Sequence, residues 1–170
     1  MAREYIKRYE KEIRPRIKLY KFENLPEDVQ EKVINDEIQF REDILLEELQ
    51  DFGEDVLSEY LVNKGINLNS QVKLESWDIY ERELTFSFDG TYKKYNINYK
   101  DGNINSYSDY EMNDLPDKIY DKISEIIDEA KEETLASIKS YYENYTDSDN
   151  VKKDLIEEGH LYTIKGEFKE

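Results

Sequence analysis

Residues 84–100, LTFSFDGTYKKYNINYK, decide the fold class of this chain. Apolar and polar residues alternate twice in this stretch, and the apolar set is Leu84, Phe86, Phe88, Tyr95, Ile97 and Tyr99. Alternation with a period of two is typical of strands that bury one face. Asp89-Gly90 and Asp101-Gly102 favour hairpin turns, because a type I′ turn needs a positive φ at both central residues. The stretch therefore predicts an antiparallel β meander of about 4–5 strands with one aromatic face.

A long helix is predicted before the meander. It begins at Asn24-Leu25-Pro26-Glu27-Asp28, since proline is tolerated in a first turn, and it stops at Lys64-Gly65. Its apolar positions step by three or four residues, as on one helix face: Leu45, Leu49, Phe52, Val56 and Tyr60. Gly53 lies inside this run, so we expect the helix to bend or divide there.

A second long helix is predicted from Leu115-Pro116-Asp117 to about Tyr145. Its apolar stripe is Ile119, Ile123, Ile126, Ile127, Ala130, Ile138, Tyr141 and Tyr145. Shorter segments are expected as a strand over 16–22, a helix over 150–158 and a closing strand over 160–168. Together these elements predict one α+β domain over residues 1–170, in which two long acidic amphipathic helices pack with the meander.

The charge of the chain is strongly negative and unevenly distributed. Residues 1–21 hold eight basic and three acidic residues, which gives this segment a net charge of +5. Since the whole chain has a net charge of −17, the other 149 residues carry −22. Residues 1–15 form a basic N-terminal arm, and a helical turn or two is expected over residues 4–13. So much negative charge should repel nucleic acid and anionic membranes and attract basic protein surfaces. We therefore expect no direct nucleic-acid or membrane partner, and a monomer or small dimer.

The chain contains few of the residue types that catalytic and cofactor sites need. The chain has no cysteine and a single histidine, His160, which we expect to be a surface or partly packed side chain. Catalytic triads and zinc sites are thereby excluded, and no phosphate-binding glycine motif occurs. Residues 101–109 place oxygen-bearing side chains like a calcium loop, but Ser106 and Met112 stand where Gly and Glu are needed. We expect a binding protein rather than an enzyme, with no metal and no cofactor.

Localisation is predicted from the same features. No apolar run approaches the roughly 20 residues of a membrane span, and the basic N-terminus lacks the apolar stretch of a signal peptide. The absence of cysteine suits a reducing compartment. We therefore expect a cytoplasmic protein.

Several segments together resemble a family of small acidic proteins found in phages and bacterial mobile elements. The matching stretches are Tyr20–Asp36 (YKFENLPEDVQEKVIND), Ile44–Ile66 (ILLEELQDFGEDVLSEYLVNKGI), Leu84–Gly90 (LTFSFDG) and Ser148–Phe168 (SDNVKKDLIEEGHLYTIKGEF). The resemblance implies a phage accessory protein without an enzymatic role, and some relatives are loosely described as antitoxin-like. Residues 77–83 (WDIYERE) depart from the family, which often has a glycine-rich polar run there.

Two rows of acidic residues are the candidate binding site. The first predicted helix carries Asp43, Glu47, Asp51, Asp55 and Glu59, and the second carries Asp117, Asp121, Glu125, Asp128 and Glu132. Successive charges lie about 6 Å apart along each axis, against a phosphate every ~3.4 Å per strand of duplex DNA. A solvated helix face gives the same pattern, so the rows alone do not separate solubility from recognition.

The negative charge of the chain, its two acidic rows and the family resemblance together lead to one functional expectation. It is an accessory protein that presents a DNA-mimicking acidic surface to the basic groove of a nucleic-acid-binding host protein, such as a CRISPR effector nuclease. An antitoxin-like protein-binding module is one version of this expectation. A phage structural or assembly protein that associates through its tyrosine-rich surface is the alternative from another class.

Overall fold

The computed structural model describes residues 17–108 and 111–169, so the expected basic arm and the helical turn over 4–13 lie outside the described residues. The chain divides into two compact units. The smaller unit consists of the residues up to Glu37 together with those from Val151 onwards, and the larger unit is Ile38–Asn150. The candidate acidic rows belong to the larger unit.

Two long helices dominate the chain, as the sequence predicts. Helix α2 spans Glu27–Asn63 and helix α3 spans Asp117–Thr146. Gly65 has the positive φ of 93° that a helix stop favours, and the Lys64 amide donates to the Tyr60 carbonyl at 3.1 Å. Both predicted helix starts are confirmed within a residue or two.

Gly53 neither divides nor ends α2, so the expected division of the helix at this residue is wrong. Its missing side chain instead provides space for two neighbours in the core. A Cβ at this position would lie 2.7 Å from Leu74 Cδ2 and 3.0 Å from Ile138 Cδ1. Glycine therefore serves packing at this position rather than a special backbone conformation, because a larger residue would displace the ends of these two side chains.

The larger unit contains a six-stranded antiparallel sheet. Its strands are β2 (Ile66–Leu68), β3 (Lys73–Asp78), β4 (Glu83–Tyr92), β5 (Tyr95–Lys100), β6 (Asn103–Ser108) and β7 (Glu111–Asn113). Strands β2 and β3 both pair with β4, and the order then continues through β5 and β6 to β7. This arrangement confirms the α+β class and the meander packed on helices.

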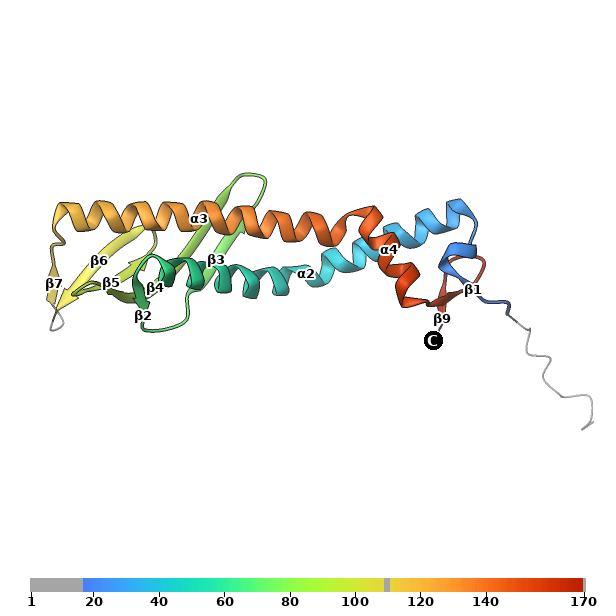
Figure 1. Ribbon diagram of the computed structural model, residues 1–170, viewed down its shortest axis with the longest axis horizontal. Helices are drawn as coiled ribbons and strands as arrows, with labels where there is room; N and C mark the ends of the chain where they lie inside the picture. The colour runs from blue at the N-terminus through green and yellow to red at the C-terminus, as the bar shows by residue number, and fades with distance from the viewer. Residues whose placement is uncertain (1–16, 109–110, 170) are drawn as a thin grey trace, which may run out of the picture. The chain divides into compact units, whose positions relative to one another are not determined.

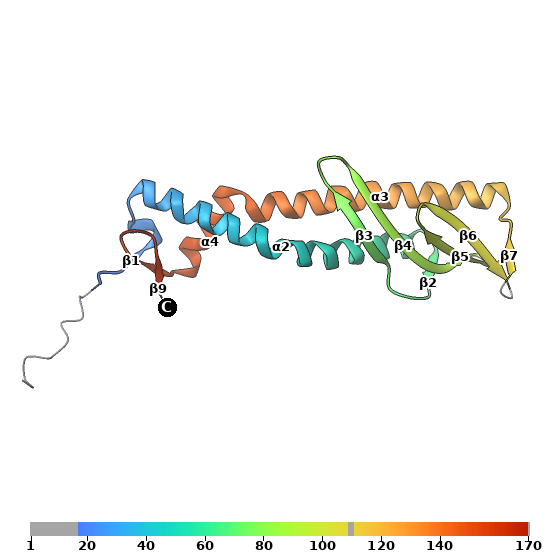
Figure 2. The same ribbon diagram turned by 180° about the vertical axis from the view of Figure 1, so that it is seen from behind.

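Helices α2 and α3 lie side by side along one face of this sheet, as the opposite views in Figures 1 and 2 show for the larger unit. The covered face is the aromatic one that the alternation predicts. Phe86, Phe88 and Tyr99 are buried there, with ring centroids 5.1–6.0 Å apart. The polar residues between them face away from the helices, which follows from the two-residue period of a strand.

The Asp89-Gly90 pair is not a hairpin turn, and this part of the prediction is wrong. Strand β4 runs through both residues, and the turn falls at Lys93, which has a φ of 54°. Gly90 pairs with Leu68 of β2, where a Cβ would lie 2.7 Å from the Asn67 carbonyl oxygen. The second predicted turn is correct, because Asp101 and Gly102 have φ values of 50° and 77° between β5 and β6.

The buried face of α2 differs from the predicted stripe. Phe52, Val56 and Tyr60 are half-buried, whereas the buried residues recur at every fourth position: Arg41, Leu45, Leu49, Gly53, Leu57 and Leu61. A four-residue step rotates the contact face by about 40° per step, since one turn takes 3.6 residues. In α3 the predicted stripe holds through most of its length, with Thr134 and Leu135 buried in addition.

The smaller unit contains its own sheet and apolar core. Its further elements are β1 (Tyr20–Lys21), the 3₁₀ turn η1 (Phe22–Asn24), α4 (Ser148–Glu158, which begins in the larger unit), β8 (Leu161–Tyr162) and β9 (Phe168–Lys169). The sheet order is β1-β8-β9, so the predicted strand over 160–168 is a hairpin of two short strands. Its turn contains Gly166, with a φ of 79°, packed against Val29 and Val33.

No helix in the described ranges is long and apolar enough to cross a membrane.

We predict that Gly90→Ala destabilises the larger unit by about 1–3 kcal/mol, because the added methyl group meets a backbone oxygen that side-chain rotation cannot move. Ser87→Ala, at a half-buried position of the same strand, is the control for changed strand propensity. Urea denaturation monitored by circular dichroism measures both. A Gly90→Ala protein as stable as the control would show that β2 does not approach β4 as described.

Candidate protein-binding surface

The five acidic residues predicted on α2 are all exposed. They recur every four residues from Asp43 to Glu59, with the same step as the buried row and offset from it by two positions. Two residues correspond to about 200° around a helix axis. The acidic row therefore stays opposite the core along the whole segment, even though the buried face itself rotates.

The five acidic residues predicted on α3 are exposed as well. The steps of four, four, three and four from Asp117 to Glu132 keep them within an arc of about 80° on the helix. This row is straighter than the row on α2 and also lies opposite the buried stripe. Both predicted rows are thus continuous solvent-facing surfaces.

Contacts between the helices fix how the two rows align. Gly53 faces Ile138, Tyr60 contacts Glu129 and Arg41 contacts Tyr145, so α2 and α3 are antiparallel. Glu59 consequently lies at the level of Glu132, where the two rows meet. Beyond this point the rows extend in opposite directions, and together they cover about 40 Å along the helix pair. The structure does not bring them side by side over their full length.

Two of the ten predicted carboxylates have nearby cations. Glu125 accepts an ion pair from Lys122 at 2.6 Å, one turn away on the same helix. Glu132 is paired with Arg82 at 2.5 Å, from the turn between β3 and β4. Within the described residues, the other eight carboxylates form no ion pair. Most of the negative charge of the rows is therefore uncompensated.

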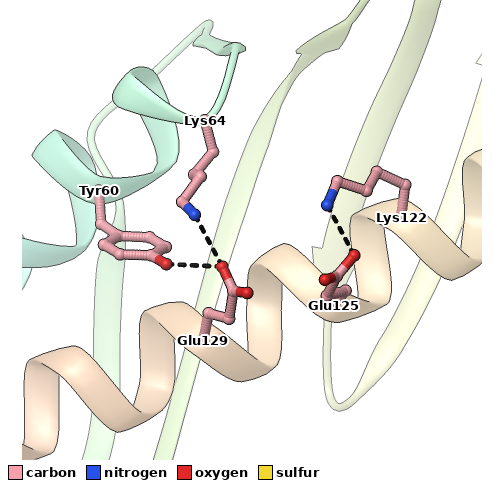
Figure 3. A network of polar contacts seen from close by, with 5 residues as sticks. All are labelled: Tyr60, Lys64, Lys122, Glu125 and Glu129. Atoms are coloured by element: carbon pink, nitrogen blue, oxygen red, sulfur yellow. Dashed lines mark hydrogen bonds and ion pairs between the residues drawn. The ribbon is translucent and has the colours of Figure 1, made fainter.

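A polar network beside the rows holds the end of α2 on α3 (Figure 3). Tyr60 Oη donates to Glu129 Oε2 at 2.7 Å, and Lys64 Nζ donates to the same oxygen at 2.9 Å. These hydrogen bonds lower the pKa of the Glu129 carboxyl and raise the pKa of Lys64 to about 12. The hydrogen bond to Glu129 also raises the pKa of the Tyr60 hydroxyl. Glu129 thus serves helix docking, and the sequence rows did not include it.

A second set of contacts joins the same helices further along. Arg41 is buried, its Nη1 donates to the Tyr145 carbonyl at 3.1 Å, and its guanidinium lies 4.7 Å from the Tyr145 ring centroid. Tyr142 Oη donates to Glu42 Oε1 at 2.8 Å, which raises the pKa of Tyr142 to about 12. Sequence reasoning missed these pairs because their members lie 100 or more residues apart. The spacing of residues within a single helix gives no indication of such pairs.

Aromatic side chains form a continuous contact between α2 and α3. The Phe52 and Tyr141 ring centroids are 5.0 Å apart, and those of Tyr141 and Tyr145 are 6.1 Å apart. We call these three residues the aromatic seam. Tyr141 was predicted as a core residue, but 36% of it is exposed. The seam therefore offers aromatic surface next to the acidic rows.

His160 and the segment compared with a calcium loop are the remaining candidate groups. His160 is 44% exposed, with its Nε2 3.1 Å from Glu158 Oε2 and its ring edge-on to Phe168 at 4.9 Å. The segment compared with a calcium loop contains the β5–β6 hairpin turn. In the described part of the chain, no three His, Cys, Asp or Glu side chains are grouped as a metal site.

Comparisons of the chain with protein-family models, curated proteins and solved structures find no match.

We predict that Glu129→Gln lowers the urea midpoint near pH 7 relative to the wild type. Because the carboxyl pKa is lowered from 4.5 by folding, its contribution is complete above pH 4.5 and is lost as the pH falls through the folded value. Folding shifts the pKa of Lys64 in the opposite direction, upwards from 10.5 to about 12. Its contribution to stability is therefore complete below pH 10.5 and is lost as the pH rises through about 12. The difference between the two proteins should therefore shrink towards both extremes. Glu133→Gln, at an exposed position, is the control, and a pH-independent difference would contradict the network.

Proposed function

We propose that this protein inhibits a nucleic-acid-binding host protein by occupying its basic groove with the acidic surface of α2 and α3. It is an accessory protein of phage or mobile-element type, it is not an enzyme, and it acts in the bacterial cytoplasm. A CRISPR effector nuclease is the first target class to test. The competing ligand in each case is the phosphate backbone that the groove normally binds.

The observation that carries this proposal is the set of eight exposed carboxylates without ion pairs in the described chain, spread along the helix pair. Like charges one turn apart destabilise a helix by a few tenths of a kcal/mol per pair. A helix face chosen only for solubility usually intersperses both signs. The asymmetry of these rows therefore supports recognition of a cationic partner.

The spacing of the charges supports a groove that binds phosphates. Each row places a carboxylate about every 6 Å, within a factor of two of the ~3.4 Å phosphate spacing along one strand. Lysine and arginine side chains that neutralise phosphates can pair with carboxylates in the same way. Binding would displace nucleic acid by direct competition, without any chemical step.

Exposed tyrosines favour the alternative of a self-associating assembly protein. Tyr80 is 78% exposed, Tyr107 40% and Tyr120 44%, and tyrosine is enriched in protein interfaces. An assembly of many copies would bring the acidic rows of neighbours together, which costs electrostatic free energy. Light scattering distinguishes the alternatives, because rings or filaments would support assembly and a monomer or small dimer supports the inhibitor.

Charge reversal along one row tests the proposal. Capture on the immobilised chain from a nuclease-treated bacterial lysate first identifies the partner. We predict that changing Asp117, Asp121 and Asp128 to Lys weakens this complex at least about a hundredfold at ~50 mM salt, because a contiguous row is lost. The wild-type complex should weaken by a similar factor between roughly 50 and 200 mM salt. Isothermal titration calorimetry measures both effects.

The matched control reverses Glu31, Glu75 and Glu167, which are exposed and lie on three different segments. It changes the net charge by the same amount without altering either row. Circular dichroism should show both variants folded. Equal weakening by the two variants would mean that the charge only steers encounter, and would contradict a groove matched to the row.

A further inference from the structure

A shallow groove lies beside the aromatic seam on the larger unit. Its volume is about 430 Å³, and we call it the seam groove. The lining residues are Phe52, Ala136, Ser137, Ser140, Tyr141 and Asn144. The groove adjoins the α2 acidic row, because Phe52 lies next to Asp51 in that helix.

The base of the groove is aromatic. The Phe52 and Tyr141 rings are tilted by 32° at 5.0 Å, and Tyr141 is the more exposed of the two. Ser137, Ser140 and Asn144 add two hydroxyl groups and an amide, all of which can accept hydrogen bonds. The groove thus combines a π surface with acceptors and without a basic residue in its lining.

Carboxylates surround this base. Glu48 and Asp55 lie on α2 four residues before and three residues after Phe52, and Glu133 lies on α3 four residues before Ser137. Such spacings place side chains on the same helix face, about 6 Å apart at Cβ. All three carboxylates are exposed and form no ion pair with described residues. Their charge selects a cationic occupant.

The molecule already shows how a cation binds this seam. At the end of the seam the Arg41 guanidinium lies 4.7 Å from the Tyr145 ring centroid and also donates to a carbonyl. Arginine suits such a site because its flat guanidinium stacks on a ring while its five N–H groups reach acceptors at the edge. A lysine ammonium is a more strongly hydrated point charge and cannot satisfy both demands at once.

We propose that the seam groove binds an arginine side chain from a basic segment of the partner protein. The guanidinium stacks on Tyr141, and the surrounding carboxylates and the groove hydroxyls accept its N–H groups. This inference rests on the proposed function, since it names one anchoring contact of the same acidic surface. It adds specificity, because charge rows alone would treat arginine and lysine alike.

The test compares fluorescein-labelled octa-arginine and octa-lysine binding to the full chain by anisotropy at about 150 mM salt. We expect Tyr141→Leu, which keeps apolar volume but removes the ring, to reduce the arginine-over-lysine affinity ratio about fivefold. The octa-lysine affinity should stay within about twofold of the wild type, since no charge changes. Tyr141→Phe keeps the ring and should keep the ratio.

Tyr120→Leu, at an exposed tyrosine of α3 outside the groove, is the matched control. An arginine preference unchanged in Tyr141→Leu, or reduced equally by Tyr120→Leu, would overturn the seam groove as an arginine site while leaving the acidic rows intact. If octa-lysine fails to bind but octa-arginine binds through Tyr141, the proposed function fails and the arginine site stands. The two proposals therefore fail on different readouts.

Discussion

The burial of one face of α2 and one face of α3 against the six-stranded sheet is the interaction on which the larger unit depends. Each helix carries like charges at successive turns of its outer face, and these repel one another. The apolar packing around Gly53 offsets that repulsion, because a residue without a side chain lets Leu74 and Ile138 come close to the backbone of α2. The acidic surface can exist only because the opposite faces pack so closely.

Patterns among neighbouring residues predicted the helices and strands. Contacts between residues far apart in the sequence determined which positions are buried and where one turn falls. Pro26, Pro116 and Gly65 mark helix ends through φ restrictions that do not depend on the rest of the fold, and the alternation in 84–100 marks the buried sheet face. Gly90 was wrongly predicted to form a turn. Glycine is needed there because the Asn67 backbone, in another strand, leaves no room for a Cβ. The same limit explains why Leu57 and Leu61, rather than Val56 and Tyr60, are the buried positions at that end of α2.

In the candidate site, too, some features follow from neighbouring residues and others depend on distant contacts. Exposure of the ten acidic residues could be predicted from helical spacing alone, and the structure places all of them on the surface. The pairing of Glu132 with Arg82, 50 residues away, could not, because it depends on the β3–β4 turn reaching α3. The aromatic seam was likewise hidden, since its rings come from two helices. Row charges would supply long-range attraction, and the seam would supply short-range selectivity.

In the proposed function, this chain and nucleic acid compete for one groove on the partner. The most direct measurement takes the captured partner, bound to a fluorescent DNA duplex, and titrates it with the full chain. We expect complete displacement of the duplex, with a midpoint that rises in proportion to the DNA concentration. A ternary complex of partner, duplex and this protein, or a midpoint independent of DNA concentration, would contradict it.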